Sequence, residues 1–169
     1  NGDGKKDLIA ANNGNFGGDN SLTILLGNGT GGFGPGSAFV PFGGQTNPYA
    51  VAPGDFNKDN KADIAFTDLA GDKVLVALGN GNGAFSVTSI ATMGTAPQGL
   101  ALGDFNGDGK LDVAVSTSSD DQVRLFLGNG DGTLRAGATF KVGRTPSRIV
   151  TADWNRDGKL DLATADTKD

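Results

Sequence analysis

The chain has 169 residues and a formal net charge of −5, with 19 acidic and 14 basic side chains. Every acidic residue is Asp and 29 residues are Gly, a composition that favours turns and is poor in helix formers. The lack of Cys and His excludes a disulfide framework, thiolate metal sites and the commonest general base. There is neither an apolar run of 18 residues nor a strongly basic face, so we expect no membrane span and no nucleic-acid partner.

Two phrases recur along the chain. The first is an acidic phrase that we call the acidic loop: NGDGKKD (1–7), DFNKDNKAD (55–63), DFNGDGKLD (104–112) and DWNRDGKLD (153–161). The second is the Gly-Asn-Gly turn: LLGNGTGGF (25–33), ALGNGNGAF (77–85) and FLGNGDGTL (126–134). From the last Asp of the acidic loop to the first Gly of the turn is 20 residues in the first repeat and 16 in the next two. Such fixed spacing indicates a structural repeat.

The segments between these phrases have the composition of short strands. In the third repeat they lie at 99–103, 112–116, 122–128 and 138–143. The first has small residues that suit a crowded centre, and the last alternates in the manner of a half-exposed rim. Four antiparallel strands in roughly 40–50 residues, repeated, are typical of a propeller blade.

We therefore predict an all-β fold in which residues 1–169 form a single β-propeller segment of about 3.5 blades. Its blades are four antiparallel strands, and the acidic loop joins the first strand to the second. The sequence repeats run roughly over 1–54, 55–103, 104–152 and 153–169, the last of them partial.

The acidic loop has the residues of a calcium site. In the third copy, alternate residues turn toward one centre and offer oxygen only: Asp104, Asn106, Asp108, Lys110 and Asp112. Oxygen ligands in this number suit Ca²⁺, which takes about 6–8 of them. We assign the first three as side-chain ligands, Lys110 as a backbone carbonyl ligand and Asp112 as the closing carboxylate. The closing acid stands at the ninth place between strands, which disfavours an EF-hand.

The same assignment in every copy predicts three complete Ca²⁺ sites and one partial site. The predicted ligands are Asn1, Asp3, Lys5, Asp7, Asp55, Asn57, Asp59, Lys61, Asp63, Asp104, Asn106, Asp108, Lys110, Asp112, Asp153, Asn155, Asp157, Lys159 and Asp161, with each Lys acting through its backbone carbonyl. Gly109 and Asn60 follow the third ligand, where we expect a left-handed backbone. Plain hairpin turns are the alternative. They do not explain why 11 of the 19 acidic residues gather here, where each pair repels by roughly 1 kcal/mol or more.

The pairing of GDFNGDGKLDVAV (103–115) with VRLFLGNGDGT (123–133) resembles the FG-GAP or VCBS repeats. These are found in integrin α-subunit propellers, in fungal and bacterial propeller lectins and in bacterial surface proteins. The resemblance implies a β-propeller with Ca²⁺ in the hairpin between the first two strands of each blade. Asn60, Ala62 and Leu134 depart locally from the usual residues of the pattern.

These features favour a non-catalytic, extracellular or cell-surface module, integrin-like or lectin-like, for adhesion or for binding a protein or glycan. The alternative is a structural subunit of a self-assembling surface layer, tube or filament. The acids are committed to metal, so we expect no enzyme. Phe56, Phe105 and Trp154 share the second place of the acidic loop, where packing between blades is favoured over stacking on a sugar.

The first acidic loop begins within the phrase. Counting from Asn1, we expect strands two to four of one blade, two full blades, and strands one and two of a fourth. Open ends of this kind invite strand addition. In the favoured explanation the 169 residues are a segment of a longer propeller. In the other, a neighbouring subunit supplies the strand by β-augmentation and the protein self-associates head to tail.

Overall fold

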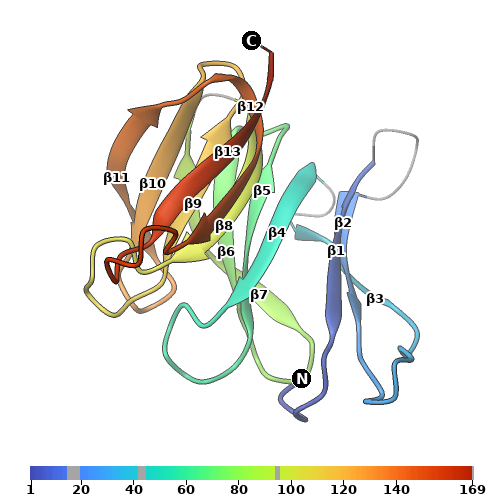
Figure 1. The fold of residues 1–169 in the computed structure, drawn as a ribbon. Coiled ribbons are helices and arrows are strands. Elements are labelled where there is room, and N and C mark those ends of the chain that lie inside the picture. Colours follow the sequence, from blue (N-terminus) through green and yellow to red (C-terminus); the bar gives the residue numbers. More distant parts are fainter. Residues whose placement is uncertain (15–19, 42–44, 94–95, 169) are drawn as a thin grey trace.

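The computed structural model describes residues 1–14, 20–41, 45–93 and 96–168. Across these residues thirteen strands form four antiparallel sheets that follow one another along the chain (Figure 1). No helix in this described part is long and apolar enough to cross a membrane. The all-β prediction is therefore confirmed.

Each sheet is one blade or part of one, and its strands pair in chain order. The first sheet holds β1 (Leu8–Asn13), β2 (Asn20–Leu25) and β3 (Ser37–Phe39). The second holds β4 (Pro48–Gly54), β5 (Asp63–Asp68), β6 (Lys73–Gly79) and β7 (Phe85–Thr92). The third holds β8 (Pro97–Gly103), β9 (Asp112–Thr117), β10 (Gln122–Gly128) and β11 (Leu134–Lys141). The fourth pairs β12 (Arg144–Ala152) with β13 (Asp161–Lys168). This is the strand count expected from the repeats.

The fourth strand of the third blade differs from its prediction. It was expected over 138–143, but β11 begins at Leu134, directly after the Gly-Asn-Gly turn. Leu134 pairs with Gly128, and a bulge between Arg124 and Phe126 on β10 adjusts the register. Pairing with β10 therefore extends the strand through the residues before 138, Gly137 included.

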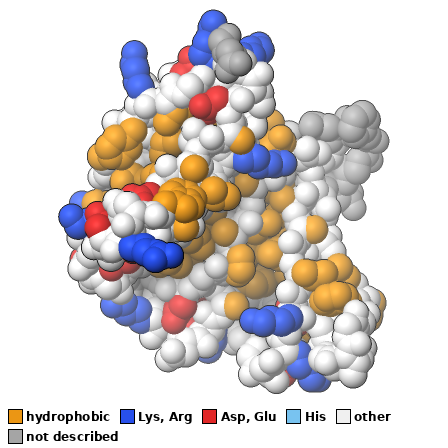
Figure 2. All heavy atoms as spheres, in the orientation of Figure 1, with side chains coloured by type: hydrophobic (Ala, Val, Ile, Leu, Met, Phe, Trp, Pro, Cys, Tyr) orange, Lys and Arg blue, Asp and Glu red, His pale blue; other side chains and the backbone are white. Residues whose placement is uncertain are grey.

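The first strands of the blades lie together at the inner side of the molecule. β4 contacts β8 and β8 contacts β12, and β4 also contacts β1, the second strand of the first blade. The outer strand β11 is largely exposed, in agreement with the predicted rim. Figure 2 shows apolar side chains in the hollow between the first blade and its neighbours.

The core lies between successive blades. Strands β5 and β9 are buried along their whole length, so each presents one face to the preceding blade and one to the next. One cluster joins blades one and two around Leu22 and Phe66, and another joins blades two and three around Phe56 and Val113. A third, smaller cluster joins blades three and four. The side chains that hold the blades together are therefore mostly those of second and third strands.

We expect Phe66→Ala to lower the free energy of unfolding by about 3–5 kcal/mol, because Phe66 is fully buried between two blades. Phe140→Ala is the matched control, since Phe140 is 49% exposed on the rim strand, and it should cost less than about 1 kcal/mol. Urea unfolding followed by circular dichroism measures both changes. Equal losses in the two variants would show that the inter-blade core does not dominate stability.

Candidate metal-binding loops

The three complete acidic loops occupy the same place in their blades. They connect β4 to β5, β8 to β9 and β12 to β13, and the residues that flank each loop pair across the hairpin, as Gly103 does with Asp112. The partial loop over 1–7 leads into β1. The predicted connection between first and second strands is confirmed, and the loops gather toward the lower end of the sheets in Figure 1.

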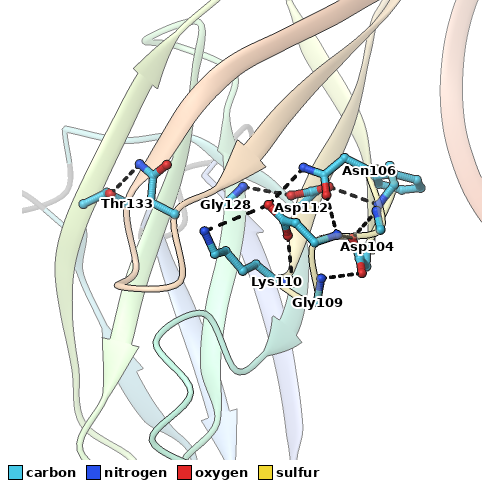
Figure 3. A network of polar contacts seen from close by, with 11 residues as sticks. Asp104, Asn106, Gly109, Lys110, Asp112, Gly128 and Thr133 are labelled. Atoms are coloured by element: carbon cyan, nitrogen blue, oxygen red, sulfur yellow. Dashed lines mark hydrogen bonds and ion pairs between the residues drawn. The ribbon is translucent and has the colours of Figure 1, made fainter.

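Within a loop, the first three predicted ligands converge on the same backbone. The Asp108 N–H donates to Asp104 Oδ1 at 3.1 Å and to Asn106 Oδ1 at 2.8 Å (Figure 3). The Gly109 N–H donates to Asp104 Oδ2 at 2.8 Å, and the Lys110 N–H to Asp108 Oδ1 at 2.9 Å. The loops over 55–63 and 153–161 repeat this pattern. The structure therefore brings the first, third and fifth residues of each complete loop together.

The loop turns by means of two left-handed residues. The sixth place was predicted, and it has φ of 75° at Gly109 and 62° at Asn60. The fourth place was missed: Gly107 has φ of 75°, while Lys58 and Arg156 adopt 61° and 62° in the other loops. A side chain in this region costs roughly 1–2 kcal/mol, so the polar bonds of the loop must hold these residues in place. Glycine at the fourth place in two loops was the available signal.

The closing Asp is engaged with the backbone of two different turns. Asp112 Oδ2 accepts the Phe105 N–H at 3.0 Å, and Oδ1 accepts the Gly128 N–H at 2.9 Å. In the second blade Asp63 does the same, with Phe56 at 2.8 Å and Gly79 at 2.9 Å. Asp63 and Asp112 are fully buried. We call this arrangement the carboxylate clamp.

The clamp explains the spacing of the two repeated phrases. In the second and third blades, the two residues 16 positions apart are joined directly, because the N–H of the first Gly of the turn donates to the closing Asp. In the first blade the spacing is 20 residues, and the Gly27 N–H donates to Asp7 Oδ1 at 2.8 Å in the same way. A Cβ at Gly79 or Gly128 would lie 2.1 or 2.2 Å from the carbonyl oxygen of Ala62 or Leu111. The first Gly is therefore required for close approach of two backbones.

Burial and repulsion act together on the clamp. Burial raises the pKa of Asp63 and Asp112, and nearby acids of their own loops add to the rise, while the backbone N–H groups oppose it. In contrast, the Lys61 backbone N–H holds the pKa of Asp59 below its ordinary value. The loops over 55–63 and 104–112 thus each pair a buried acid of raised pKa with an exposed acid, Asp59 or Asp108, of lowered pKa.

The lysines of the loops have a role that the sequence did not indicate. Their stems lie over the second Gly of the Gly-Asn-Gly turn, at Gly81 under Lys61 and at Gly130 under Lys110. Lys61 Nζ lies 3.2 Å from the Asp59 carboxylate, and the matching distance is 3.6 Å in the first loop. These pairs are exposed and contribute little to stability. They place one cation beside Asp3, Asp59 and Asp108.

The first loop departs from the others at its closing acid. The Asn1 ammonium donates to Asp7 Oδ2 at 2.8 Å, where Phe56, Phe105 or Trp154 donates a backbone N–H in the complete loops. Otherwise the pattern continues, with the Lys5 N–H on Asp3 Oδ1 at 2.9 Å.

The donor chemistry fits a hard cation. The first, third and fifth residues of each complete loop form a triad of two carboxylates and one amide, which offers side-chain oxygens as ligands. Within the residues that the structure describes, no three or more Asp, Glu, His or Cys side chains form a metal cluster. Asn completes each triad and the closing Asp is clamped to the backbone. The roles of the closing Asp and of the lysine carbonyls as ligands stay predictions.

The clamp predicts a specific loss of stability. Asp112→Ala should leave the Phe105 and Gly128 N–H groups without an acceptor and lower the free energy of unfolding by about 1–3 kcal/mol for each group. Asp108→Ala is the control, since it removes only the bonds that the Asp108 carboxylate accepts from Asn106 and Lys110 of its own loop, and it should cost less. Denaturation in excess chelator, with hydrogen exchange at Phe105 and Gly128, measures the effect. Unchanged exchange at both amides would contradict the clamp.

The raised pKa values also predict a pH dependence in chelator. A raised folded-state pKa adds stability that is fully present below the unfolded value near 3.8 and is lost as pH rises through the folded pKa. On acidification from neutral pH toward 3.8, Asp63 and Asp112 should therefore stabilise the fold. Asp59 acts in the opposite sense, because its pKa is lowered: its contribution to stability is present above pH 3.8 and is lost as the pH falls through its folded-state pKa. Urea titrations across pH measure this gain in the free energy of unfolding, and the double variant Asp63→Asn, Asp112→Asn should reduce it. If the pH dependence of unfolding is the same in the double variant, these two carboxyl groups are not the origin of the gain.

Comparison with known proteins gives a family and a fold. The family model of the FG-GAP-like repeat matches residues 1–66, 65–115 and 104–164. A search of curated proteins found no match. Among solved structures, the chain is similar to the crystal structure of BBS1N in complex with ARL6DN, soaked with lead, with a TM-score of 0.58 and 18% identity over 94% of this chain. It spans 40% of that chain, and the likeness concerns the fold. This chain belongs to the FG-GAP-like repeat family.

Proposed function

We propose that this chain is a non-catalytic, calcium-binding β-propeller module that binds protein or glycan ligands outside the cell. The observation that supports calcium is that, in each complete loop, the first Asp and the Asn accept the same backbone N–H, that of the second Asp, at 3.1 and 2.8 Å in the loop over 104–112. A bound Ca²⁺ would neutralise the acids of the triad. The chain's own loop residues hold the oxygens in position through backbone hydrogen bonds.

The extracellular role is supported by the family and by the chemistry of the proposed sites. FG-GAP-like repeats are typical of extracellular proteins, and extracellular calcium modules bind at about 10⁻⁴–10⁻³ M. Exposed triads with an amide and a lysine nearby suit such modest affinity, because a lysine ammonium beside Asp59 competes with a cation for the same carboxylate. A non-catalytic role is part of the same proposal, since the clustered acids already accept backbone hydrogen bonds and are the proposed calcium ligands.

We expect millimolar Ca²⁺ to raise the melting temperature relative to excess chelator, because a ligand that binds the folded state stabilises it by mass action. Mg²⁺ should rescue poorly, since it requires a tighter octahedral shell. Differential scanning calorimetry measures both. Identical melting in Ca²⁺ and in chelator would exclude calcium binding at these loops.

Counting ions in variants locates the sites. Native mass spectrometry of Asp108→Ala should show one bound Ca²⁺ fewer than the parent chain. Asp131→Ala is the matched control, because Asp131 is also exposed and bonds locally, to Thr133, but lies in the Gly-Asn-Gly turn. Glycan-array binding with electron microscopy then separates a ligand-binding module from the alternative structural subunit, which would polymerise without ligand.

A further inference from the structure

The Gly-Asn-Gly turn of the first blade carries a sequence pattern that its two counterparts lack. It reads Asn28-Gly29-Thr30, the Asn-x-Thr pattern of an acceptor for N-linked glycans. In the 169-residue sequence no other Asn stands two residues before Ser or Thr. At the place of Thr30 the second turn has Asn82 and the third has Asp131. So short a pattern also arises by chance, and the structure of the turn decides whether Asn28 is a suitable acceptor.

The first turn presents Asn28 at the surface with its side-chain amide in a fixed orientation. Asn28 and the two residues after it are exposed. The Asn28 Oδ1 atom accepts the Thr30 N–H at 2.8 Å, the Thr30 hydroxyl at 2.9 Å and the Gly32 N–H at 3.0 Å. Because backbone N–H groups donate to this atom, the oxygen end of the amide faces the turn. The nitrogen end, Nδ2, is the one left to react.

Gly32 leaves the space beside that nitrogen clear of a side chain of its own. A Cβ at Gly32 would lie 2.6 Å from Asn28 Nδ2. The other turns have a side chain at this place, Ala84 in the second and Thr133 in the third, and there the Asn129 Nδ2 donates to the Thr133 hydroxyl at 2.9 Å. In the part of the chain that the structure describes, Asn28 Nδ2 donates no such bond. The first turn therefore combines the sequence pattern with an exposed Asn whose amide nitrogen is not engaged by the turn.

From these observations we propose that Asn28 is a modification site, the acceptor of an N-linked glycan. The donor is a sugar chain activated as a diphosphate ester. Asn28 Nδ2 attacks C1 of the first sugar, the N–C1 bond forms as the C1–O bond to the diphosphate breaks, and the diphosphate leaves with the bonding electron pair. Nδ2 gives up one proton and keeps the other. Oδ1 stays an amide oxygen and can hold its bonds to the turn.

The inference goes beyond the proposed function, and it rests on the extracellular part of that function, because N-linked glycans are carried by secreted chains. It requires neither calcium nor a bound ligand. The glycan would stand beside the first acidic loop, since the Lys5 stem lies 3.4 Å from the Cβ position of Gly29 in the same turn. A bulky, solubilising group there would oppose close packing of chains through this end of the blade.

Secretion of the chain tests the proposal. The 169 residues are expressed behind a secretion signal in a mammalian cell line, where the donor is a lipid diphosphate, and the purified chain is measured by intact mass spectrometry. We expect a glycosylated form whose added mass is removed by peptide:N-glycosidase. In heavy-oxygen water the enzyme should leave a labelled Asp at position 28, which distinguishes deglycosylation from spontaneous deamidation of the Asn28–Gly29 pair. A secreted chain without added glycan overturns the proposal.

Variants of Thr30 test the sequence pattern in the same cells. Thr30→Ala should lose the glycan completely, and Thr30→Ser, which keeps the hydroxyl, should retain it. A glycan that persists on Thr30→Ala overturns the assignment to Asn28. Melting curves establish that both variants fold. Melting of the unglycosylated Thr30→Ala chain in Ca²⁺ and in chelator tests the calcium proposal separately, so the two proposals can fail independently.

Variants of Gly32 and Gly34 test the folded turn. Unmodified, folded chain from bacteria is treated with an N-glycosyltransferase and a nucleotide-activated glucose, and the rate of modification at Asn28 is measured by mass spectrometry. Gly32→Ala should react more slowly than the parent chain, because its methyl group would lie against Nδ2. Gly34→Ala is the matched control, since its Cβ would lie 3.7 Å from the nearest atom, and it should react at the parent rate. A parent chain that is not modified, or equal rates in both variants, overturns the role of this turn.

Discussion

The carboxylate clamp is the interaction on which the rest of the structure depends. A buried carboxylate without a cationic partner is unfavourable, and here two backbone N–H groups from different turns stabilise it. One group belongs to the acidic loop, and the other begins the Gly-Asn-Gly turn. The clamp thereby fixes the hairpin of the acidic loop against the hairpin of the Gly-Asn-Gly turn in the same blade, at the edge of an inter-blade core. Replacing Asp112 by an apolar residue would leave two donors unsatisfied, one in each of the two turns that the clamp joins.

From the clamp outward, each blade is attached to the next by a few contacts of the same kind. Phe56 follows the first Asp of its loop, so the clamp that holds its N–H also directs its ring into the interface with the third blade. Its carbonyl accepts the Gly132 N–H of that blade at 3.0 Å. The fold is accordingly a series of nearest-neighbour interfaces, in which a local change should act mainly on the two blades it touches.

The sequence predicted the features that depend on residue identity and spacing. Repeats showed the strand count, the hairpin position of the loops and the left-handed place filled by Gly109 and Asn60. It did not predict features that depend on where the backbone lies. The left-handed fourth place was hidden because Lys58 is not a residue typical of that region, and the clamp was visible as a spacing without its cause. The extent of β11 depended on pairing with β10 across a bulge, which local composition does not reveal.

Backbone hydrogen bonds hold the side-chain oxygens of each loop close together, and this bears on what a cation would do in the proposed sites. Asp104 and Asn106 already accept from the Asp108 N–H, so their oxygens are held close together despite the charge on the acids. Lys61, beside Asp59, supplies a partial and solvent-screened counter-charge. A cation bound there would offset the negative charge of the loop acids. The gain in stability would come mainly from relieving repulsion, including the part that helps to raise the pKa of the buried clamp.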